Sequence, residues 1–93
     1  MKKYELVLIL TEEAGKNEAL AQKLAKEIVS KVKGKIVDTK VLGVRDFAYP
    51  INKVVKGWYG FFVVELDGGV IPEIEKNIKL EEKIIRYLLV RAE

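Results

Sequence analysis

The order in which apolar residues change their spacing constrains the fold of this chain more than any single residue does. Four segments, near residues 3–10, 35–47, 57–66 and 83–91, are β-rich and alternate as strands do. Two segments between them, 17–32 and one that begins near Pro72, have helical spacing. The 93 residues contain no linker, so a single domain, 1–93, is expected. The order βαββαβ predicts an α+β fold, the ferredoxin-like split βαβ sandwich, with a four-stranded antiparallel sheet and two helices on one face.

Both helices should present an apolar stripe to the sheet. In the first helix the stripe consists of Leu20, Leu24, Ile28 and Val32, supported by Ala21 and Ala25. Gly34 follows in the position of a helix stop. In the second helix the stripe consists of Val70 or Ile71, Ile74 and Ile78. The segment TEEAG, residues 11–15, is expected to be a break between the first strand and the first helix.

This architecture leaves one face of the sheet without helices, and alternation identifies the side chains expected there. Glu5, Glu65 and Arg86 should not lie in the core, so residues in phase with them point outward. The expected outward apolar set is Val7, Ile9, Tyr59, Phe61, Val63, Leu88 and Val90. The expected inward set is Tyr4, Leu6, Leu8, Leu10, Trp58, Gly60, Phe62, Val64, Leu66, Ile85, Tyr87 and Leu89. A contiguous outward patch of this size exceeds what a monomer exposes, which favours a covering partner over scattered surface residues or a homodimer.

The composition excludes several kinds of site. The chain has no cysteine and no histidine, so it lacks thiolate metal ligands, disulfides and the most common general base. Glu65 and Asp67 resemble a solvated strand end more than a catalytic pair, and no glycine-rich phosphate loop is present. We therefore expect no enzyme activity, no metal, no cofactor and no small-molecule substrate. The apolar run Leu6–Leu10 is too short to span a membrane, and no cleavage site of a signal peptide follows it.

Charge is distributed unevenly along the chain. Seventeen basic and fourteen acidic residues give a formal net charge of +3. Between Lys40 and Gly60 four basic residues, Lys40, Arg45, Lys53 and Lys56, face a single acid, Asp46. Lys83, Arg86 and Arg91 add positive charge near the end of the chain. One side of the molecule is therefore expected to be more positive than the net charge indicates.

The segment LGVRDFAYPINK, Leu42 to Lys53, resembles the most recognisable motif of the bacterial ribosomal small-subunit protein six family, roughly Leu-Gly-x-Arg-x-Leu-Ala-Tyr-Pro-Ile-x-Lys. The matching residues are Leu42, Gly43, Arg45, Ala48, Tyr49, Pro50, Ile51 and Lys53. KYELVLIL and IIRYLLVR also resemble the first and last strands of the family, so the resemblance covers essentially the whole chain. It implies the fold expected above, a cytoplasmic location in the ribosome, and a structural role in the small subunit. It also implies pairing with ribosomal protein eighteen and binding to the central domain of the small-subunit ribosomal RNA.

The resemblance assigns roles to two groups of residues. The residues expected to contact RNA phosphates are Lys2, Lys3, Arg45, Lys53, Lys56, Arg86 and Arg91. The residues expected to contact the protein partner are Val7, Ile9, Tyr49, Tyr59, Phe61, Val63, Leu88 and Val90. Tyr49 before Pro50 favours an extended backbone, so the connection is expected to be a semi-rigid extension of the sheet. The alternative is that Tyr49, Pro50 and Ile51 fold back and close the core. Asp46 departs from the family, which often has a basic residue there. Many members have a C-terminal tail beyond the last strand, and because the sequence stops at Glu93 we expect no function of such a tail.

Two other classes of domain share this order of elements. KGWYGFFVV resembles the aromatic strand of RNA recognition motifs, with Tyr59 and Phe61 outward as base stacking requires. The first strand offers Val7 and Ile9 instead of an aromatic residue, which favours a protein partner. A small-molecule regulatory domain of this fold is normally attached to an enzyme, and no such domain is present in the sequence.

Overall fold

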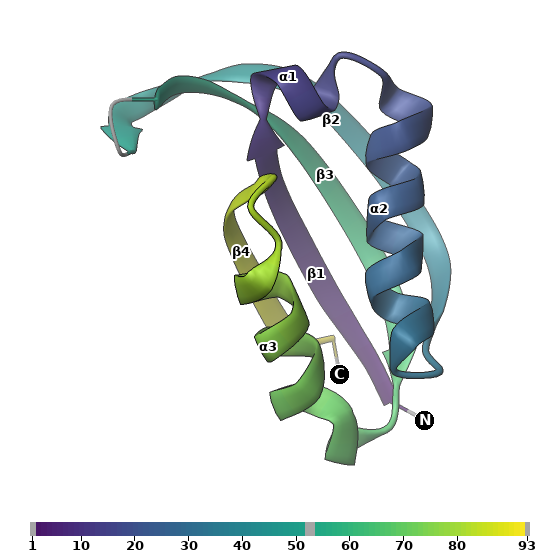
Figure 1. Ribbon diagram of the computed structural model, residues 1–93. Coiled ribbons are helices and arrows are strands. Elements are labelled where there is room, and N and C mark those ends of the chain that lie inside the picture. Colours follow the sequence, from purple (N-terminus) through teal and green to yellow (C-terminus); the bar gives the residue numbers. More distant parts are fainter. Residues whose placement is uncertain (1, 52–53, 93) are drawn as a thin grey trace.

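The computed structural model describes residues 2–51 and 54–92, with the backbone alone for residues 47–51, 54 and 55. The elements are β1 (Lys2–Thr11), α1 (Glu12–Gly15), α2 (Glu18–Lys31), β2 (Lys35–Ile51), β3 (Val54–Leu66), the 3₁₀ turn η1 (Gly68–Val70), α3 (Ile71–Leu80) and β4 (Ile84–Arg91). The four strands form one antiparallel sheet in the order β2-β3-β1-β4. Figure 1 shows α2 and α3 on the same face of this sheet. The predicted fold class is confirmed.

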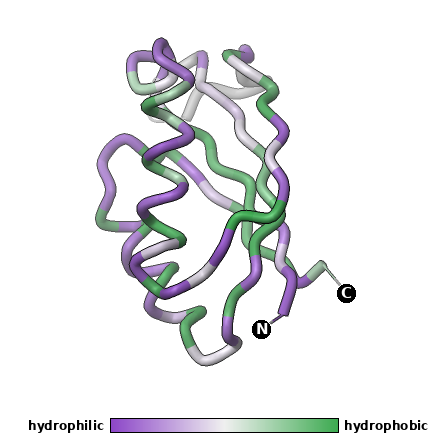
Figure 2. Tube along the Cα trace, turned by 90° about the vertical axis from the view of Figure 1, so that its right-hand side faces the viewer, coloured by the Kyte–Doolittle hydropathy of each residue, from purple (hydrophilic) through white to green (hydrophobic). Residues whose placement is uncertain are grey.

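The core lies between the two long helices and the central strands. Its fully buried members include Leu6, Leu8 and Leu10 of β1, Trp58, Phe62, Val64 and Leu66 of β3, and Ile74 and Ile78 of α3. Tyr4, Tyr87 and Leu89 are partly buried against this cluster, as are Val70 and Ile71. Alternation therefore predicted the inward side of β1 and β3 correctly. Along the tube of Figure 2 the helices alternate between hydrophilic and hydrophobic residues, as amphipathic helices do.

The face that α2 buries differs from the predicted one. Leu20 is 59% exposed and Leu24 is only half-buried. The residues of α2 and its C-cap that enter the core are Ala21, Ala25, Ile28, Val29 and Val32. Ile28, Val32 and the two alanines are buried as predicted, and Val29 joins them, so in the first half of the helix the buried face is centred on Ala21 and Ala25, one residue after Leu20 and Leu24. The prediction that Leu20 packs in the core was wrong.

The end of α2 also differs from the sequence interpretation. The residue in the left-handed conformation is Lys33, with φ 62°, rather than Gly34. The Lys33 N–H donates to the Ser30 carbonyl at 2.9 Å and the Gly34 N–H to the Val29 carbonyl at 3.0 Å, which is a Schellman ending. A Cβ on Gly34 would lie 2.5 Å from Cδ2 of Leu66. Gly34 is therefore needed for close packing between the helix end and β3.

The segment 11–15, expected to be a break, contains the single turn α1. The side chain of Thr11 caps it by accepting a hydrogen bond from the Ala14 N–H at 3.1 Å. A Cβ on Gly15 would lie 2.3 Å from Cβ of Trp58. This turn therefore packs directly against the tryptophan at the end of the sheet.

The register of β4 contains one irregularity. Ile9 lies opposite Arg86, but Leu10 lies opposite Ile84, so one extra residue of β4 is accommodated between these pairs. Ile84 packs against the core in the place that alternation gave to Ile85, which is a correction to the predicted inward set. Further along, Leu88 and Val90 point outward as expected, with 57% and 41% exposure.

Candidate functional site

The face of the sheet opposite the helices carries the predicted apolar residues side by side. Val7 lies between Phe61 of β3 and Leu88 of β4 in the register. We call the sheet patch the set Val7, Ile9, Tyr59, Phe61, Val63, Leu88 and Val90. Leu88 and Val90 are exposed, and the other five are half-buried by their neighbours in the sheet. The structure therefore brings together all but one of the predicted protein contacts. Tyr49 belongs to β2, but its side chain lies outside the described residues.

Residues that pair across neighbouring strands form rows, and the rows on either side of Val7 show where the sheet patch ends. Lys40 of β2 lies opposite Phe61, at the edge of the most apolar row. The next row towards the chain ends contains Glu5, between Val63 and Val90. In the opposite direction, Ile9 lies between Tyr59 and Arg86. The patch is thus an apolar centre with charged residues at its borders, which is the usual organisation of a protein interface.

Arg45 is held at one end of the sheet patch by the backbone of β2. The register is irregular between Val41 and Gly43, and Gly43 adopts a φ of 79° opposite Tyr59. Nε of Arg45 donates a hydrogen bond to the carbonyl of Leu42 at 3.0 Å. Arg45 pairs with Gly57 and so lies on the same face as Tyr59. The hydrogen bond therefore directs the Arg45 side chain back along β2, towards the Leu42 carbonyl.

Lys56 lies on the other face of the β2–β3 hairpin. It is opposite Asp46, and its Nζ is 4.0 Å from Oδ1 of that residue, with both side chains well exposed. Adjacent residues of a strand point to opposite faces, so Lys56 and Arg45 do not share one surface. Asp46 also partly neutralises the charge that Lys56 would offer to a phosphate.

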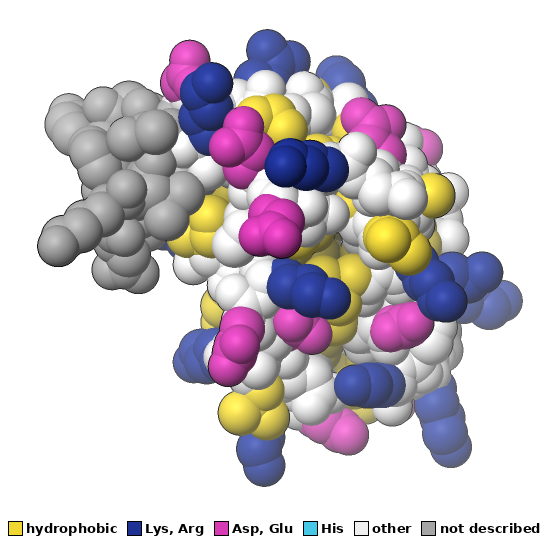
Figure 3. All heavy atoms as spheres, turned by 45° about the horizontal axis from the view of Figure 1, so that its top comes forward, with side chains coloured by type: hydrophobic (Ala, Val, Ile, Leu, Met, Phe, Trp, Pro, Cys, Tyr) yellow, Lys and Arg dark blue, Asp and Glu magenta, His cyan; other side chains and the backbone are white. Residues whose placement is uncertain are grey.

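The other residues predicted to contact RNA fall at two ends of the molecule. Arg86 pairs with Ile9, near the hairpin end of the sheet. Lys2 and Lys3 begin β1, and Arg91 pairs with Tyr4 at that same end. Tyr4 and Ile9 are five residues apart on one strand, which corresponds to about 17 Å. Lys53 lies outside the described residues. In Figure 3 the basic side chains on the visible face stand among acidic ones rather than in one continuous patch.

The β2–β3 hairpin is longer than predicted, and its register is irregular. Asp46 pairs with Lys56 and Ile51 with Val54, with an irregularity between these pairs. Five residue steps along β2 therefore match two along β3. β2 is an edge strand, where proline is tolerated because its missing N–H need not pair inward. The prediction that this segment extends the sheet agrees with strands that continue to Ile51 and begin again at Val54.

The edge strand β4 is joined to α3 by one side-chain hydrogen bond. The hydroxyl of Tyr87 donates to Oε2 of Glu75 at 2.6 Å. This bond raises the pKa of Tyr87 above its usual value, and burial and the negative charge of Glu75 raise it further. The contact fixes β4 on its inner side, while Leu88 and Val90 on its outer side stay in the sheet patch.

The match to a known family decides how this surface is interpreted. The family model described as Ribosomal protein S6 matches residues 3–91. The chain belongs to this family. This confirms the family that the segment Leu42–Lys53 predicted, and with it a protein of the small ribosomal subunit, located in the ribosome in the cytoplasm.

Individual members of the family are similar to this chain over nearly its full length. The Small ribosomal subunit protein bS6 of Phytoplasma australiense is 33% identical over 98% of this chain and 99% of that protein. The protein of the same name from Geobacter metallireducens is 35% identical over 100% of this chain and 80% of its own length. The crystal structure of 30S ribosomal protein S6 from Thermotoga maritima covers 97% of this chain and 86% of that one, with 33% identity and a TM-score of 0.79.

Several features of the site were not accessible to sequence reasoning. Alternation assumes an unbroken register, so it did not identify the irregularities of β2 or the contact of Arg45 with the Leu42 carbonyl. It also left out Lys40 as a border of the patch. Among the described residues no cluster of three or more metal-ligating side chains occurs, and no helix is long and apolar enough to cross a membrane.

Proposed function

We propose that this chain, as a structural protein of the small ribosomal subunit, binds ribosomal protein eighteen through the sheet patch and the central domain of the small-subunit ribosomal RNA through basic residues beside it. The observation that carries the protein contact is the row in which Phe61, Val7 and Leu88 lie next to one another. This row is flanked by further apolar residues, and α2 and α3, the long helices of the described part of the chain, lie on the other face of the sheet. Burying such a surface against a partner removes apolar area from water at roughly 25 cal/mol per Å².

The RNA contact is assigned to the hairpin end of the sheet. Arg45 and Arg86 both point to the face of the sheet patch, at the end where Tyr59 and Ile9 lie. A protein seated on the patch would bring its own surface next to these two arginines. The RNA site would then be shared between the two proteins, and the chain alone would bind RNA weakly. Arg45 suits this role because its hydrogen bond to Leu42 already restricts the side chain.

A free-standing RNA-recognition domain is the second candidate. The half-exposed rings of Tyr59 and Phe61 favour it, because exposed aromatic rings in a sheet stack on unpaired bases. Their partners on β1 are Ile9 and Val7, so the rings are surrounded by aliphatic side chains. This surrounding favours a protein contact over a stacking platform.

The test introduces a charge into the sheet patch at an exposed position. Leu88→Asp is suitable because Leu88 is 57% exposed, so the substitution is expected to leave the fold intact. Binding to ribosomal protein eighteen, measured by calorimetry, should weaken at least tenfold because a carboxylate would be buried against apolar atoms. Leu80→Asp, at a residue 70% exposed at the end of α3 on the other face, is the matched control and should bind normally.

Leu88→Asp and a further variant, Phe61→Ala, separate the two candidates. In the proposed function, a central-domain RNA fragment assembles with both proteins together and loses affinity with Leu88→Asp. In a stacking domain, the chain alone binds unpaired RNA tightly, and Phe61→Ala costs about 1–3 kcal/mol of that affinity. Tight binding to generic single-stranded RNA without a partner, lost in Phe61→Ala, would contradict the proposed function.

A further inference from the structure

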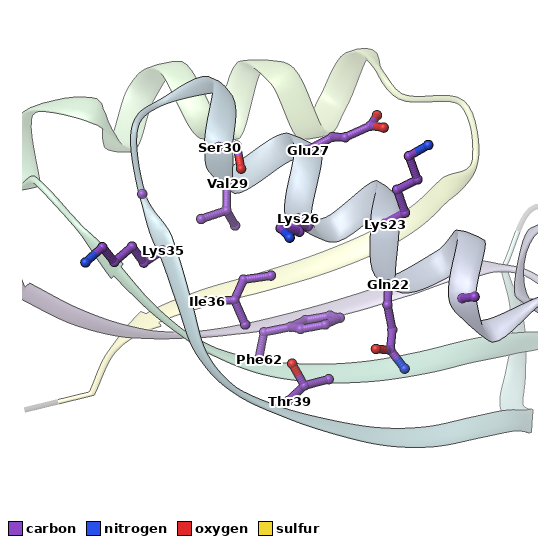
Figure 4. A pocket seen from close by; sticks show the side chains of 12 residues that line it. Gln22, Lys23, Lys26, Glu27, Val29, Ser30, Lys35, Ile36, Thr39 and Phe62 are labelled. Atoms are coloured by element: carbon purple, nitrogen blue, oxygen red, sulfur yellow. The ribbon is translucent and has the colours of Figure 1, made fainter.

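A groove of about 920 Å³ runs between α2 and the edge strand β2, on the helix side of the sheet. Figure 4 shows Gln22 and Val29 directed from α2 towards Ile36, Thr39 and Phe62 below. The floor consists of Val29 and Phe62, which are buried, and of Ile36, which is half-buried. This groove lies on the opposite side of the sheet from the sheet patch, so one occupant would not exclude the other.

Positive charge is concentrated around this groove. Lys23, Lys26 and Lys35 line it, together with a single acid, Glu27. The segment 22–36, which supplies nine of the twelve lining residues, contains five lysines and one glutamate, a formal charge of +4, although Lys31 and Lys33 do not line the groove. The whole chain carries +3, so the remaining residues are together net negative. The lining itself, with three lysines and one glutamate, has a formal charge of +2 beside an apolar floor, and an anionic ligand is attracted to it.

The shape and the floor favour an acidic peptide over RNA. A groove between a helix and an edge strand accepts an extended segment, whose alternate side chains point into it. The Phe62 ring that lines the groove is fully buried, so it offers no face for base stacking. The N–H of Thr39 already donates to Oδ1 of Asp38 at 2.9 Å, so it is not free to pair with an added strand. An extended peptide in the groove would therefore bind at this point through its side chains and not as a fifth strand.

We propose that the α2–β2 groove is a docking site for an extended acidic segment of a protein partner. An aliphatic side chain of the segment would pack over Ile36, and its carboxylates would contact Lys23 and Lys26 on the helix and Lys35 on the strand. Lysine suits this purpose because its charge sits on a long flexible stem that also covers apolar surface. This site is independent of the partner proposed for the sheet patch.

The test uses a fluorescein-labelled peptide, Glu-Asp-Glu-Leu-Glu-Asp-Glu, and fluorescence anisotropy with the full chain. The peptide Gln-Asn-Gln-Leu-Gln-Asn-Gln serves as the uncharged probe, and oligouridine RNA as the competing polyanion. The variant K23E/K26E should bind the acidic peptide about tenfold more weakly, since two attractions become repulsions. The control K76E/K79E makes the same charge change on α3, away from the groove, and should bind within about twofold of the unaltered chain, because salt screens distant charges.

Each outcome has a defined consequence. Saturable binding of the acidic peptide, weakened by K23E/K26E and not by the control, with amide NMR shifts at Ile36 and Thr39, supports the proposal. No saturable binding, equal binding of the uncharged peptide, or an equal loss in both double variants overturns it. Oligouridine binding that depends on Lys23 and Lys26, without peptide binding, overturns it in favour of an RNA contact. Circular dichroism confirms that both double variants are folded.

Discussion

At the scale of single residues, Tyr87 joins α3 to β4 through its hydrogen bond to Glu75. A hydrogen bond to a charged group contributes about 1.5–3 kcal/mol when it is shielded from water, and both residues here are only half-buried. A contribution of about 1 kcal/mol is therefore reasonable. The bond requires the hydroxyl proton, and the raised pKa of Tyr87 reflects first this bond, then burial and the charge of Glu75.

Tyr87→Phe should lower the free energy of unfolding by about 1 kcal/mol near neutral pH, as measured by urea titration. The pKa of Tyr87 is raised in the folded chain relative to its usual value of 10.0. The stabilisation is therefore complete below about pH 10 and is lost as the pH rises through the higher folded value. The difference between the two proteins should consequently narrow in strongly alkaline solution. A difference that stays constant with pH would show that this hydroxyl does not make the bond.

At the scale of elements, the sequence predicted the order, type and approximate position of every long helix and strand. It also predicted which side of β1 and β3 is buried, because full burial of Leu6, Leu8 and Phe62 imposes a strict period of two. It failed at β4 and α2 for different physical reasons. A one-residue irregularity near Ile85 changes the phase of a strand without a local signal in composition. In α2, Ala21 and Ala25 rather than Leu20 face the sheet, because helical spacing alone does not distinguish two apolar faces that lie one residue apart.

Alanine substitutions along α2 should reveal this rotated face. Ile28→Ala, at a residue 4% exposed, should cost about 2–5 kcal/mol of unfolding free energy. Leu20→Ala, at 59% exposure, should change it by less than about 0.5 kcal/mol. Leu24→Ala should fall between the two, because Leu24 is half-buried against the core. Urea titration measures all three, and a cost at Leu20 similar to that at Ile28 would contradict the packing described above.

At the scale of the whole molecule, the candidate surfaces lie on opposite sides of the sheet. The sheet patch faces away from the helices, whereas the α2–β2 groove lies beside α2 on the helix side. The predicted RNA contacts do not form one cluster, because Lys2, Lys3 and Arg91 stand at the other end of the strands from Arg45 and Arg86. Alternation predicts which side chains of one strand share a face. It does not predict that Arg45 of β2 and Lys56 of β3 lie on opposite faces of the hairpin. That division depends on the register of β2 and β3.

The ion pair between Lys56 and Asp46 gives a test of the RNA assignment for the whole molecule. With ribosomal protein eighteen present, affinity for a central-domain RNA fragment should fall with salt, and Arg45→Gln should reduce the slope of log affinity against log salt by about 0.9. Asp46→Asn should raise the affinity, because it releases Lys56 from its partner at 4.0 Å and removes a negative charge from the hairpin. Lys56→Gln measures the contribution of the lysine itself, and filter binding at several salt concentrations measures all three. If Asp46→Asn leaves the affinity unchanged while Arg45→Gln reduces it, RNA contacts the Arg45 face of the hairpin alone.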